Sequence, residues 1–212
     1  MRSYGQYCAA AKALDVIGDR WTLLIVRELL ARGACRYTDL RDGLPGIATN
    51  LLADRLRQLE EAGLVSREEA PPPIATTLFR LTLRGEELRA VIDELVRWGI
   101  PFMVDGPNGD AFRAHWFVLP AELALTDRAP QRPPVTIEVR TGDAPLLIET
   151  VDGSVRARQG AAEDADAVVT GTPHVVAGLL SGRLALDDAV ALGLDCEGDV
   201  RALRRVLPRS PA

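Results

Sequence analysis

The stretch that decides the fold is "GIATNLLADRLRQLEEAGLVSREEAPPPIATTLFRLTLRG", residues 46–85. Its first part places Leu52, Leu56 and Leu59 at i, i+4 and i+7, which is the spacing of one buried helix face. This helix ends near Gly63, because glycine favours the end of a helix. The opposite face of the predicted helix is left free for contacts outside the chain, and it carries Asn50, Ala53, Asp54 and Arg57.

Two runs of β-compatible residues, 64–69 and 76–83, flank the segment "APPPIA" immediately after this helix. Proline fixes an extended backbone and donates no hydrogen bond, so the pattern predicts a β-hairpin with a stiff tip. A second apolar stripe then predicts one long helix over residues 85–103. The quoted stretch therefore contains a helix, a two-stranded wing and the start of another helix.

The chain before this stretch adds further helices. Periodic apolar residues predict helices over 8–17 and 21–31, followed by a short helix near 37–41 and a tight turn at 43–46. The resulting order is helix, helix, short helix, helix, strand, strand, helix. This order is that of a winged helix-turn-helix, in which the second helix of the pair has the shape that enters the major groove of DNA.

Four blocks in this order resemble the HxlR-type family of bacterial winged-helix transcriptional regulators. They are "YCAAAKALDVIGDRWTLLIVRELL", "RYTDLRDGLPGI", "LLADRLRQLEEAGLVSR" and "LTLRG". The resemblance implies a homodimer on a palindromic double-stranded DNA operator, with the first helix and the long helix after the wing forming the dimer contact. It also places Ala48 where the family often has a serine, with Thr49 as a possible substitute cap, and aligns Thr76 with a wing-tip arginine.

We expect DNA contacts from the helix that carries Leu52, Leu56 and Leu59 and from the base of the wing. Arginine reads guanine and asparagine reads adenine by paired hydrogen bonds, which favours Arg57 and Asn50 as base contacts. Arg55 borders the leucine stripe, so it either anchors the helix internally or grips phosphate. The competing interpretation of this face is a solvated helix surface. The predicted DNA-binding residues are Thr49, Asn50, Ala53, Asp54, Arg55, Arg57, Arg67 and Arg80.

The net charge of the chain does not support the prediction that it binds DNA. The net charge is −5, whereas cationic side chains normally supply most non-specific DNA affinity. Residues 1–105 have 14 Lys and Arg against 15 Asp and Glu, and residues 106–212 have 11 against 15. The DNA prediction therefore depends on the order of elements, and we expect a modest, salt-sensitive affinity.

The three cysteines, Cys8, Cys35 and Cys196, are too few and too widely spaced for a disulfide framework. This usage fits a reducing cytoplasm, and no signal peptide or membrane-spanning segment is expected. Cys8 matches a cysteine that senses electrophiles or oxidants in some HxlR-type members, and Lys12 lies one turn along on the same face. A buried structural cysteine is the competing interpretation.

The second half of the chain follows a different pattern. The glycine-rich and proline-containing segment "VDGPNGD", residues 104–110, is the expected domain boundary. Beyond it, short β-like runs precede helices that begin near Pro173, Asp187 and Asp199, an α+β arrangement. The β-like runs cover residues 115–119, 135–140, 145–151 and 166–170.

Part of this half, "LLSGRL" and "LGLDCEGD", resembles the end of a sterol-carrier-protein-like fold. The resemblance implies a layer of sheet and helices around an apolar tunnel for a lipid-like small molecule. The aliphatic residues of the helices there are the candidate lining, although a plain hydrophobic core would use the same residues. The candidate ligand-binding residues are Val176, Leu179, Leu180 and Leu184.

No nucleophile motif, phosphate-binding loop or metal-ligand spacing is found, so we expect neither an enzyme nor a cofactor nor a metal. The prediction is an α+β chain, with a winged helix-turn-helix over residues 1–104 and a smaller sterol-carrier-like α+β domain over residues 110–212. Its predicted function is a cytoplasmic, homodimeric, DNA-binding regulator controlled by a small apolar ligand. The alternatives are a thiol sensor using Cys8 and a lipid-binding carrier whose winged helix mediates protein association.

Overall fold

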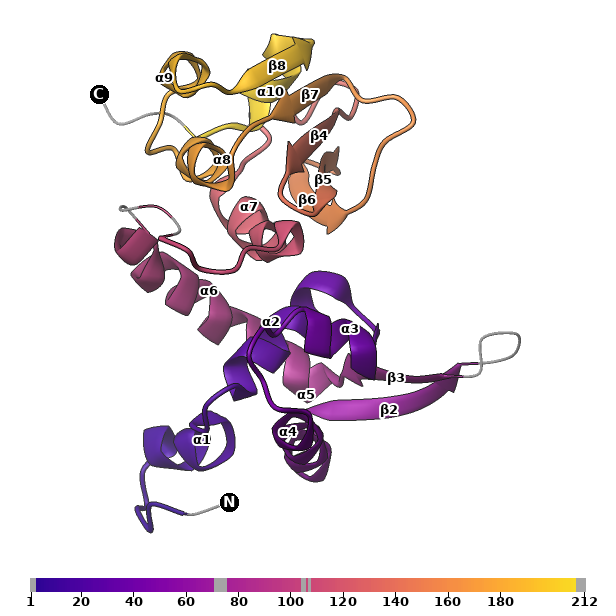
Figure 1. The fold of residues 1–212 in the computed structure, drawn as a ribbon, viewed down its shortest axis with the longest axis vertical. Helices are drawn as coiled ribbons and strands as arrows, with labels where there is room; N and C mark the ends of the chain where they lie inside the picture. The colour runs from indigo at the N-terminus through magenta and orange to yellow at the C-terminus, as the bar shows by residue number, and fades with distance from the viewer. Residues whose placement is uncertain (1–2, 71–75, 104–105, 107, 209–212) are drawn as a thin grey trace. The chain divides into compact units, whose positions relative to one another are not determined.

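A computed structural model describes residues 3–70, 76–103, 106 and 108–208. The chain divides into two compact units that meet in the sequence between Leu95 and Val96 (Figure 1). Parts of "APPPIA" and of "VDGPNGD" lie outside the described residues, so the predicted stiff wing tip and the boundary at 104–110 stay predictions. Each unit has its own hydrophobic core and is described by itself.

The first unit is a winged helix-turn-helix, as predicted. Among the described residues of this unit, α1 to α4 precede the hairpin, and α5 and the first part of α6 follow it; α6 itself continues past Leu95 (Figure 1). The helices are α1 (Ala9–Ile17), α2 (Thr22–Arg32), α3 (Tyr37–Asp42), α4 (Thr49–Glu61), α5 (Leu83–Glu86) and α6 (Arg89–Gly99), and the hairpin strands are β2 (Val65–Ala70) and β3 (Thr76–Leu81).

The core of this unit forms around the leucine stripe of α4. Leu52, Leu56 and Leu59 are all buried, and they pack with Ile25 of α2 and Phe79 of β3. Burying a leucine side chain stabilises a fold by about 1.5 to 3 kcal/mol, so these contacts fix α4 against the scaffold. Because the leucine face is buried, the opposite face of α4 lies at the surface.

A short strand that the sequence did not reveal completes the wing. Strand β1 (Cys35–Arg36) pairs antiparallel with β3, which lies between β1 and β2. Two residues are too few to produce an alternating pattern, and the pairing partners are far apart in the sequence. The wing is thus a three-stranded sheet whose central strand is β3.

The prediction of one continuous helix over residues 85–103 is wrong. Thr82 caps a short helix α5 by accepting a hydrogen bond from Gly85 N–H at 3.1 Å. A turn follows before α6, and residues Ile100–Met103 form the 3-10 helix η1 around Pro101. Gly85 packs so closely on the Leu64 carbonyl that a side chain has no room there, which holds the helix start against the wing.

The second unit is built on one five-stranded sheet with the order β6-β5-β4-β7-β8. Strands β4 and β7 are parallel, and the other neighbouring pairs are antiparallel. The strands are β4 (Thr136–Thr141), β5 (Ala144–Val151), β6 (Ser154–Gln159), β7 (Ala167–Thr170) and β8 (Asp195–Gly198), and the helices are η2 (Ala114–Phe117), α7 (Val118–Ala124), α8 (Pro173–Leu180), α9 (Leu186–Ala191) and α10 (Val200–Val206).

The prediction was an α+β second half, and the mixture of helices with one sheet is confirmed, but some predicted elements differ. The expected strand over 115–119 is helical, since η2 and α7 bury Phe117, Val118 and Ala121 on one side. Strands β6 and β8 were not predicted, because both lie at sheet edges and contain several charged residues. The predicted helices near Pro173, Asp187 and Asp199 are all present.

Candidate nucleic-acid interface

The exposed face of α4 carries most of the predicted contacts. Thr49, Asn50, Ala53, Asp54 and Arg57 are all exposed along one side of this helix. The leucine stripe on the other side is buried in the core. Five surface positions on one helix face of a helix-turn-helix have the arrangement needed to meet base edges and phosphates in a major groove.

Arg57, the cation of this face, is paired within its own helix. Arg57 Nη2 donates to Asp54 Oδ1 at 2.9 Å, and its Nε lies 3.9 Å from Glu61 Oε1. All three side chains are largely exposed, so these ion pairs contribute little stability. Arg57 can therefore exchange its carboxylate partners for DNA, but only in competition with them.

The sequence left two roles open for Arg55, an internal anchor of the helix or a phosphate contact. In the structure its side chain lies in the internal position. Its side chain is 16% exposed, and its Nη1 lies 3.0 Å from Asp19 Oδ2. The same guanidinium donates to the Arg20 carbonyl at 3.3 Å and to Gln58 Oε1 at 2.5 Å. Arg55 thus ties α4 to the loop before α2, and its role as a phosphate contact has no support in this arrangement.

A hydrogen bond from a residue of α3, and not a side-chain cap, holds the start of α4 in place. Ala48 is the N-cap residue and provides no side-chain acceptor, and Thr49 is the first helical residue, so Thr49 does not replace the missing serine cap. Instead, Tyr37 Oη donates to the Thr49 carbonyl at 2.6 Å. Asn50 Oδ1 accepts from the Leu51 N–H at 3.0 Å, which leaves the Asn50 amide group to donate outward.

The two wing cations are also neutralised by carboxylates of the chain. Arg67 donates to both oxygens of Glu60, at 2.7 and 2.5 Å, and this pairing raises the pKa of Arg67. Its guanidinium also lies over the Phe79 ring. Arg80 Nη2 lies 3.2 Å from Glu68 Oε2. A phosphate group must therefore displace a carboxylate at either position, consistent with a modest affinity.

A buried carboxylate supports the turn that leads into α4. Glu28 of α2 is fully buried; Arg27 Nη2 donates to its Oε1 at 2.6 Å, and Arg32 lies 3.8 Å from its Oε2. Arg27 Nη2 also donates to the Gly43 carbonyl at 3.2 Å, and a side chain at Gly43 would collide with the Glu28 carboxylate. Arg27 and Glu28 interrupt the apolar run of residues 21–30 in the sequence. Their role in supporting the turn before α4 was not predicted.

Cys8 lies outside this interface, at the N-cap of α1. Its thiol is exposed, and the backbone N–H groups of Ala11 and Ala10 lower its pKa. The exposure rules against the buried structural interpretation of Cys8. Cys35 is different, because burial raises the pKa of its thiol to about 11.

The candidate ligand residues of the second unit lie in a packed core. Val176, Leu179 and Leu180 of α8 are buried, and Leu184 is half-buried against Gly178. In the parts of the chain that the structure describes, His, Cys, Asp and Glu side chains form no group of three or more that could hold a metal ion. None of the helices described there has both the length and the apolar character needed to cross a bilayer.

Comparison with known proteins assigns the first unit. Residues 16–105 match the model of the HxlR-like helix-turn-helix family. The transcriptional regulator YvaP of Bacillus subtilis is 33% identical over 87 residues, which are 41% of this chain and 80% of that protein. The chain belongs to the HxlR-like helix-turn-helix family. It is accordingly a DNA-binding transcriptional regulator and not an enzyme.

One further relative matches about the same share of the HxlR-like chain, both in sequence and as a solved structure. The transcriptional regulator YodB of Bacillus subtilis is 32% identical over 94 residues, which are 44% of this chain and 83% of that protein. The solved structure of the reduced form of YodB is 30% identical with a TM-score of 0.41, and it covers 48% of this chain and 99% of that one. These matches cover less than half of the chain.

Proposed function

We propose that this regulator reads an operator through the exposed face of α4, with Arg57 and Asn50 contacting base edges and Arg67 and Arg80 contacting phosphate. The observation that carries the proposal is the division of α4 into a buried leucine stripe and an exposed polar face. Arginine and asparagine on such a face match the hydrogen-bonding groups of guanine and adenine. The assignment of individual residues is part of the proposal.

The test begins with selection of binding sites from a random duplex pool by the full chain. Fluorescence anisotropy then compares the selected duplex with a scrambled one at several salt concentrations. Base contacts predict a sequence preference that persists across salt, whereas phosphate contacts alone predict equal, steeply salt-dependent binding of both duplexes. Equal affinity for both duplexes at every salt concentration contradicts the proposal.

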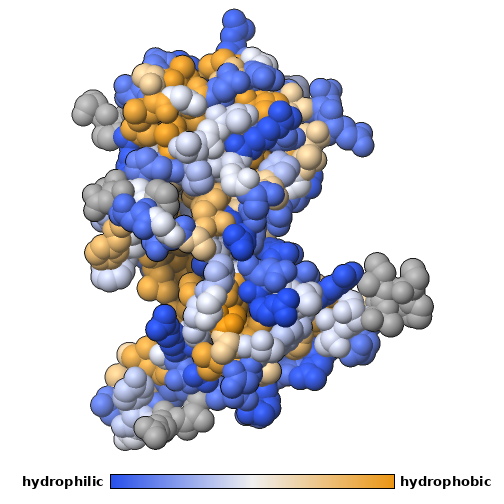
Figure 2. Space-filling model, in the orientation of Figure 1, coloured by the Kyte–Doolittle hydropathy of each residue, from blue (hydrophilic) through white to orange (hydrophobic). Residues whose placement is uncertain are grey.

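We further propose that the regulator acts as a homodimer. Val91, Leu95 and Trp98 occupy i, i+4 and i+7 on α6, and all three are exposed. Leu14 of α1 is exposed as well, and in Figure 2 apolar residues reach the surface along α6. An exposed apolar stripe of this kind is typical of an association surface. A two-fold dimer would bind half-sites about 34 to 36 Å apart, one turn of DNA.

Control by a small apolar ligand in the second unit is the remaining part of the proposed function. It is supported by the sterol-carrier-like sequence resemblance and by the apolar helix α8, which packs with α7 and α9. Since Val176, Leu179 and Leu180 are packed, a ligand would enter by displacing the half-buried Leu184. Fatty acyl probes that raise the melting temperature in the parent chain but not in a Leu184→Asp variant would support this site.

A second candidate function is thiol sensing, which the geometry of Cys8 favours. The Cys8 thiol is exposed at the N-cap of a nine-residue helix, where two backbone N–H groups lower its pKa. A lowered pKa increases the fraction of the reactive thiolate at neutral pH. Alkylation of Cys8 that leaves DNA affinity unchanged would exclude this function while leaving the DNA-binding face intact.

A further inference from the structure

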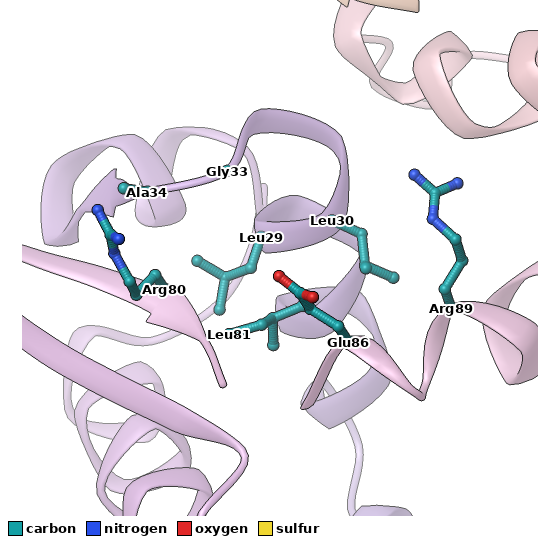
Figure 3. A pocket seen from close by; sticks show the side chains of 8 residues that line it. All are labelled: Leu29, Leu30, Gly33, Ala34, Arg80, Leu81, Glu86 and Arg89. Carbon is teal, nitrogen blue, oxygen red and sulfur yellow. The ribbon is translucent and has the colours of Figure 1, made fainter. Parts of the chain in front are cut away.

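Most cations of the first unit lie close to a carboxylate of the same unit. On the wing, for example, Arg80 is held by Glu68 at 3.2 Å, and its side chain lines a groove together with Ala34 and Leu81 (Figure 3). Ion pairs of this kind hold cations of α1, α2, α3, α4, the wing and α5. Each such cation contributes less to DNA affinity, because a phosphate must first displace its carboxylate.

Arg20, in the loop before α2, is an exception. Its side chain is exposed, and its guanidinium forms no ion pair with a carboxylate of the described residues. Arg36 shares this property, but the guanidinium of Arg20 is in addition held against a ring, with its Cζ over the Trp21 ring at 5.6 Å. Stacking uses the flat face of a guanidinium and leaves the N–H groups at its edge available to an anion.

The residue that supports Arg20 has a strained backbone. Trp21 has a φ of 79°, in the left-handed region, where the other described residues besides glycine are Asn108 and Asp152. Asparagine and aspartate tolerate this region, whereas a bulky residue there is an outlier of a kind that clusters at functional sites. The Trp21 ring packs on the core, and its Cη2 lies 4.0 Å from the position of a Cβ added at Gly46. The ring therefore reaches the turn that leads into α4.

The same loop is also tied to α4 itself. Arg55 Nη1 lies 3.0 Å from Asp19 Oδ2, and Arg55 Nε donates to the Arg20 carbonyl at 3.3 Å. The neighbours of Arg20 on both sides are thus anchored, Asp19 to α4 and Trp21 to the turn before it. These contacts hold an unneutralised guanidinium beside the helix that is proposed to enter the major groove.

We propose that Arg20 contacts a DNA phosphate at the edge of the groove that α4 enters. Phosphates line both edges of the groove, and contacts to them fix the register of a protein on DNA without reading its sequence. A guanidinium binds a phosphate by charge-assisted hydrogen bonds. Because no carboxylate of the described residues is paired with Arg20, this contact releases counterions without breaking an ion pair. The inference rests on the proposed function and adds a phosphate contact to it.

The test uses the full chain and the selected operator. Each phosphate of the duplex is replaced in turn by an uncharged methylphosphonate, and anisotropy gives the affinity of the parent and of Arg20→Gln for every substituted duplex. We expect one phosphate in each half-site whose neutralisation weakens the parent by about fivefold or more and leaves Arg20→Gln unaffected. Arg84→Gln removes an exposed arginine that pairs with Glu87 in the segment after the wing, and it should respond as the parent does.

The salt dependence provides a second measurement. Arg20→Gln should weaken the selected and the scrambled duplex by the same factor, about tenfold at low salt, and reduce the slope of log affinity against log salt by about 0.9. Arg20→Lys keeps the charge and should retain most of the parent's slope. Melting temperatures check that each variant is folded, and Arg20→Ala, with the same expected result, replaces Arg20→Gln if that variant folds poorly.

Failure of this inference can be distinguished from failure of the proposed function. A parent that prefers the selected duplex, with an Arg20→Gln variant that keeps the parent's salt slope and its response to every methylphosphonate, overturns the contact at Arg20 and leaves the proposed function standing. A parent that binds both duplexes alike contradicts base reading by α4, whereas the salt slope of Arg20→Gln still decides the contact at Arg20. A parent that binds neither duplex overturns both.

Discussion

The guanidinium of Arg55 in α4 lies 3.0 Å from the carboxylate of Asp19 in the loop before α2. The contact joins the helix that is proposed to read DNA to a segment 36 positions earlier in the sequence. It also explains why a cation on this helix faces inward while Arg57, two residues later, faces solvent. Orientation of the proposed reading helix thus depends on a side chain that does not itself need to touch DNA.

Arg55→Ala is expected to lower the free energy of unfolding by about 1 to 2 kcal/mol, since packing of its aliphatic stem is lost along with the ion pair. Asp19→Ala should cost less. A double-mutant cycle between the two, measured by urea denaturation, should show a coupling energy of about 0.5 to 1 kcal/mol. Fully additive single-variant effects would show that the pair does not hold the helix.

Glu28→Gln should destabilise the chain by about 3 to 5 kcal/mol, because it leaves the Arg27 guanidinium partly buried without its charged partner. Gly43→Ala should destabilise it too, as the added methyl group collides with the Glu28 carboxylate. Glu61→Gln on exposed α4 is the control, with an expected change within about 0.5 kcal/mol. Equal denaturation midpoints for Glu28→Gln and Glu61→Gln would refute the supporting role of Glu28.

Leu95→Glu/Trp98→Glu should convert a dimer into a monomer, because two charges on the exposed stripe of α6 cannot be buried unpaired. Light scattering should return twice the mass of one chain for the parent and the mass of one chain for the variant. Arg84→Glu is a control that adds negative charge on α5, outside the stripe. A parent that is monomeric at micromolar concentration contradicts the dimer proposal.

The second unit should lose stability at low pH through the pair of Asp127 and Arg205. Arg205 donates to both Asp127 oxygens, at 2.7 and 2.8 Å, and thereby lowers the pKa of Asp127. Because the folded-state pKa lies below the unfolded value of about 3.9, the stabilisation is complete above that pH and is lost as pH falls through the lower folded pKa.

Asp127→Asn should accordingly lower the melting temperature by several degrees at pH 7. The difference from the parent should shrink as pH falls below the unfolded value of about 3.9 and through the lower folded pKa of Asp127, where the parent loses this charge too. Differential scanning calorimetry across this range provides the measurement. A difference of the same size at every pH would mean that Asp127 does not act through its charge.

The exposed thiol of Cys8 should react with iodoacetamide faster than an ordinary exposed cysteine at pH 7. The pH at which its reaction rate is half-maximal should lie below the usual thiol pKa. Cys35 should react only after unfolding, because its thiol is buried and its pKa is raised to about 11. Mass spectrometry of timed samples assigns each modification. Similar rates for the two folded-state thiols would contradict the geometry at the N-cap.

Local patterns were sufficient to predict the winged helix. The stripe of Leu52, Leu56 and Leu59 fixes which face of α4 is buried, and therefore which face is exposed. Elements that depend on long-range pairing escaped prediction. Strand β1 exists through pairing of Cys35 with Phe79, and the start of α5 is held by the approach of Gly85 to the Leu64 carbonyl.

The chemical environment of the candidate site residues could be predicted least. Composition shows that charges balance in the first half, but it does not show that Arg57, Arg67 and Arg80 each pair with a carboxylate. Such pairs form between side chains whose directions are set by the finished fold. Likewise, the strand expected at 115–119 is helical because Phe117 and Val118 are buried on a helical face, which a short apolar run does not distinguish from a strand.

Intrahelical pairing of Arg57 leads to a prediction about affinity. Asp54→Asn removes the carboxylate 2.9 Å from the guanidinium and also a negative charge from the proposed DNA face. Affinity for all duplexes should rise several-fold, most at low salt, because repulsion from phosphate is reduced. Fluorescence anisotropy with selected and scrambled duplexes checks this. An unchanged affinity would place Asp54 away from DNA, and a weaker one would contradict the prediction that its carboxylate opposes binding.

The most direct test of the account is the effect of Arg57→Ala on sequence preference, measured by anisotropy against every single-base variant of the selected operator. We predict a loss of about 1 to 3 kcal/mol on the parent operator and loss of discrimination at one base pair in each half-site. Arg84→Ala, in the short helix α5 after the wing, should leave both quantities unchanged. An Arg57→Ala protein that retains the parent's affinity and its full base preference would contradict the claim that this face of α4 reads DNA.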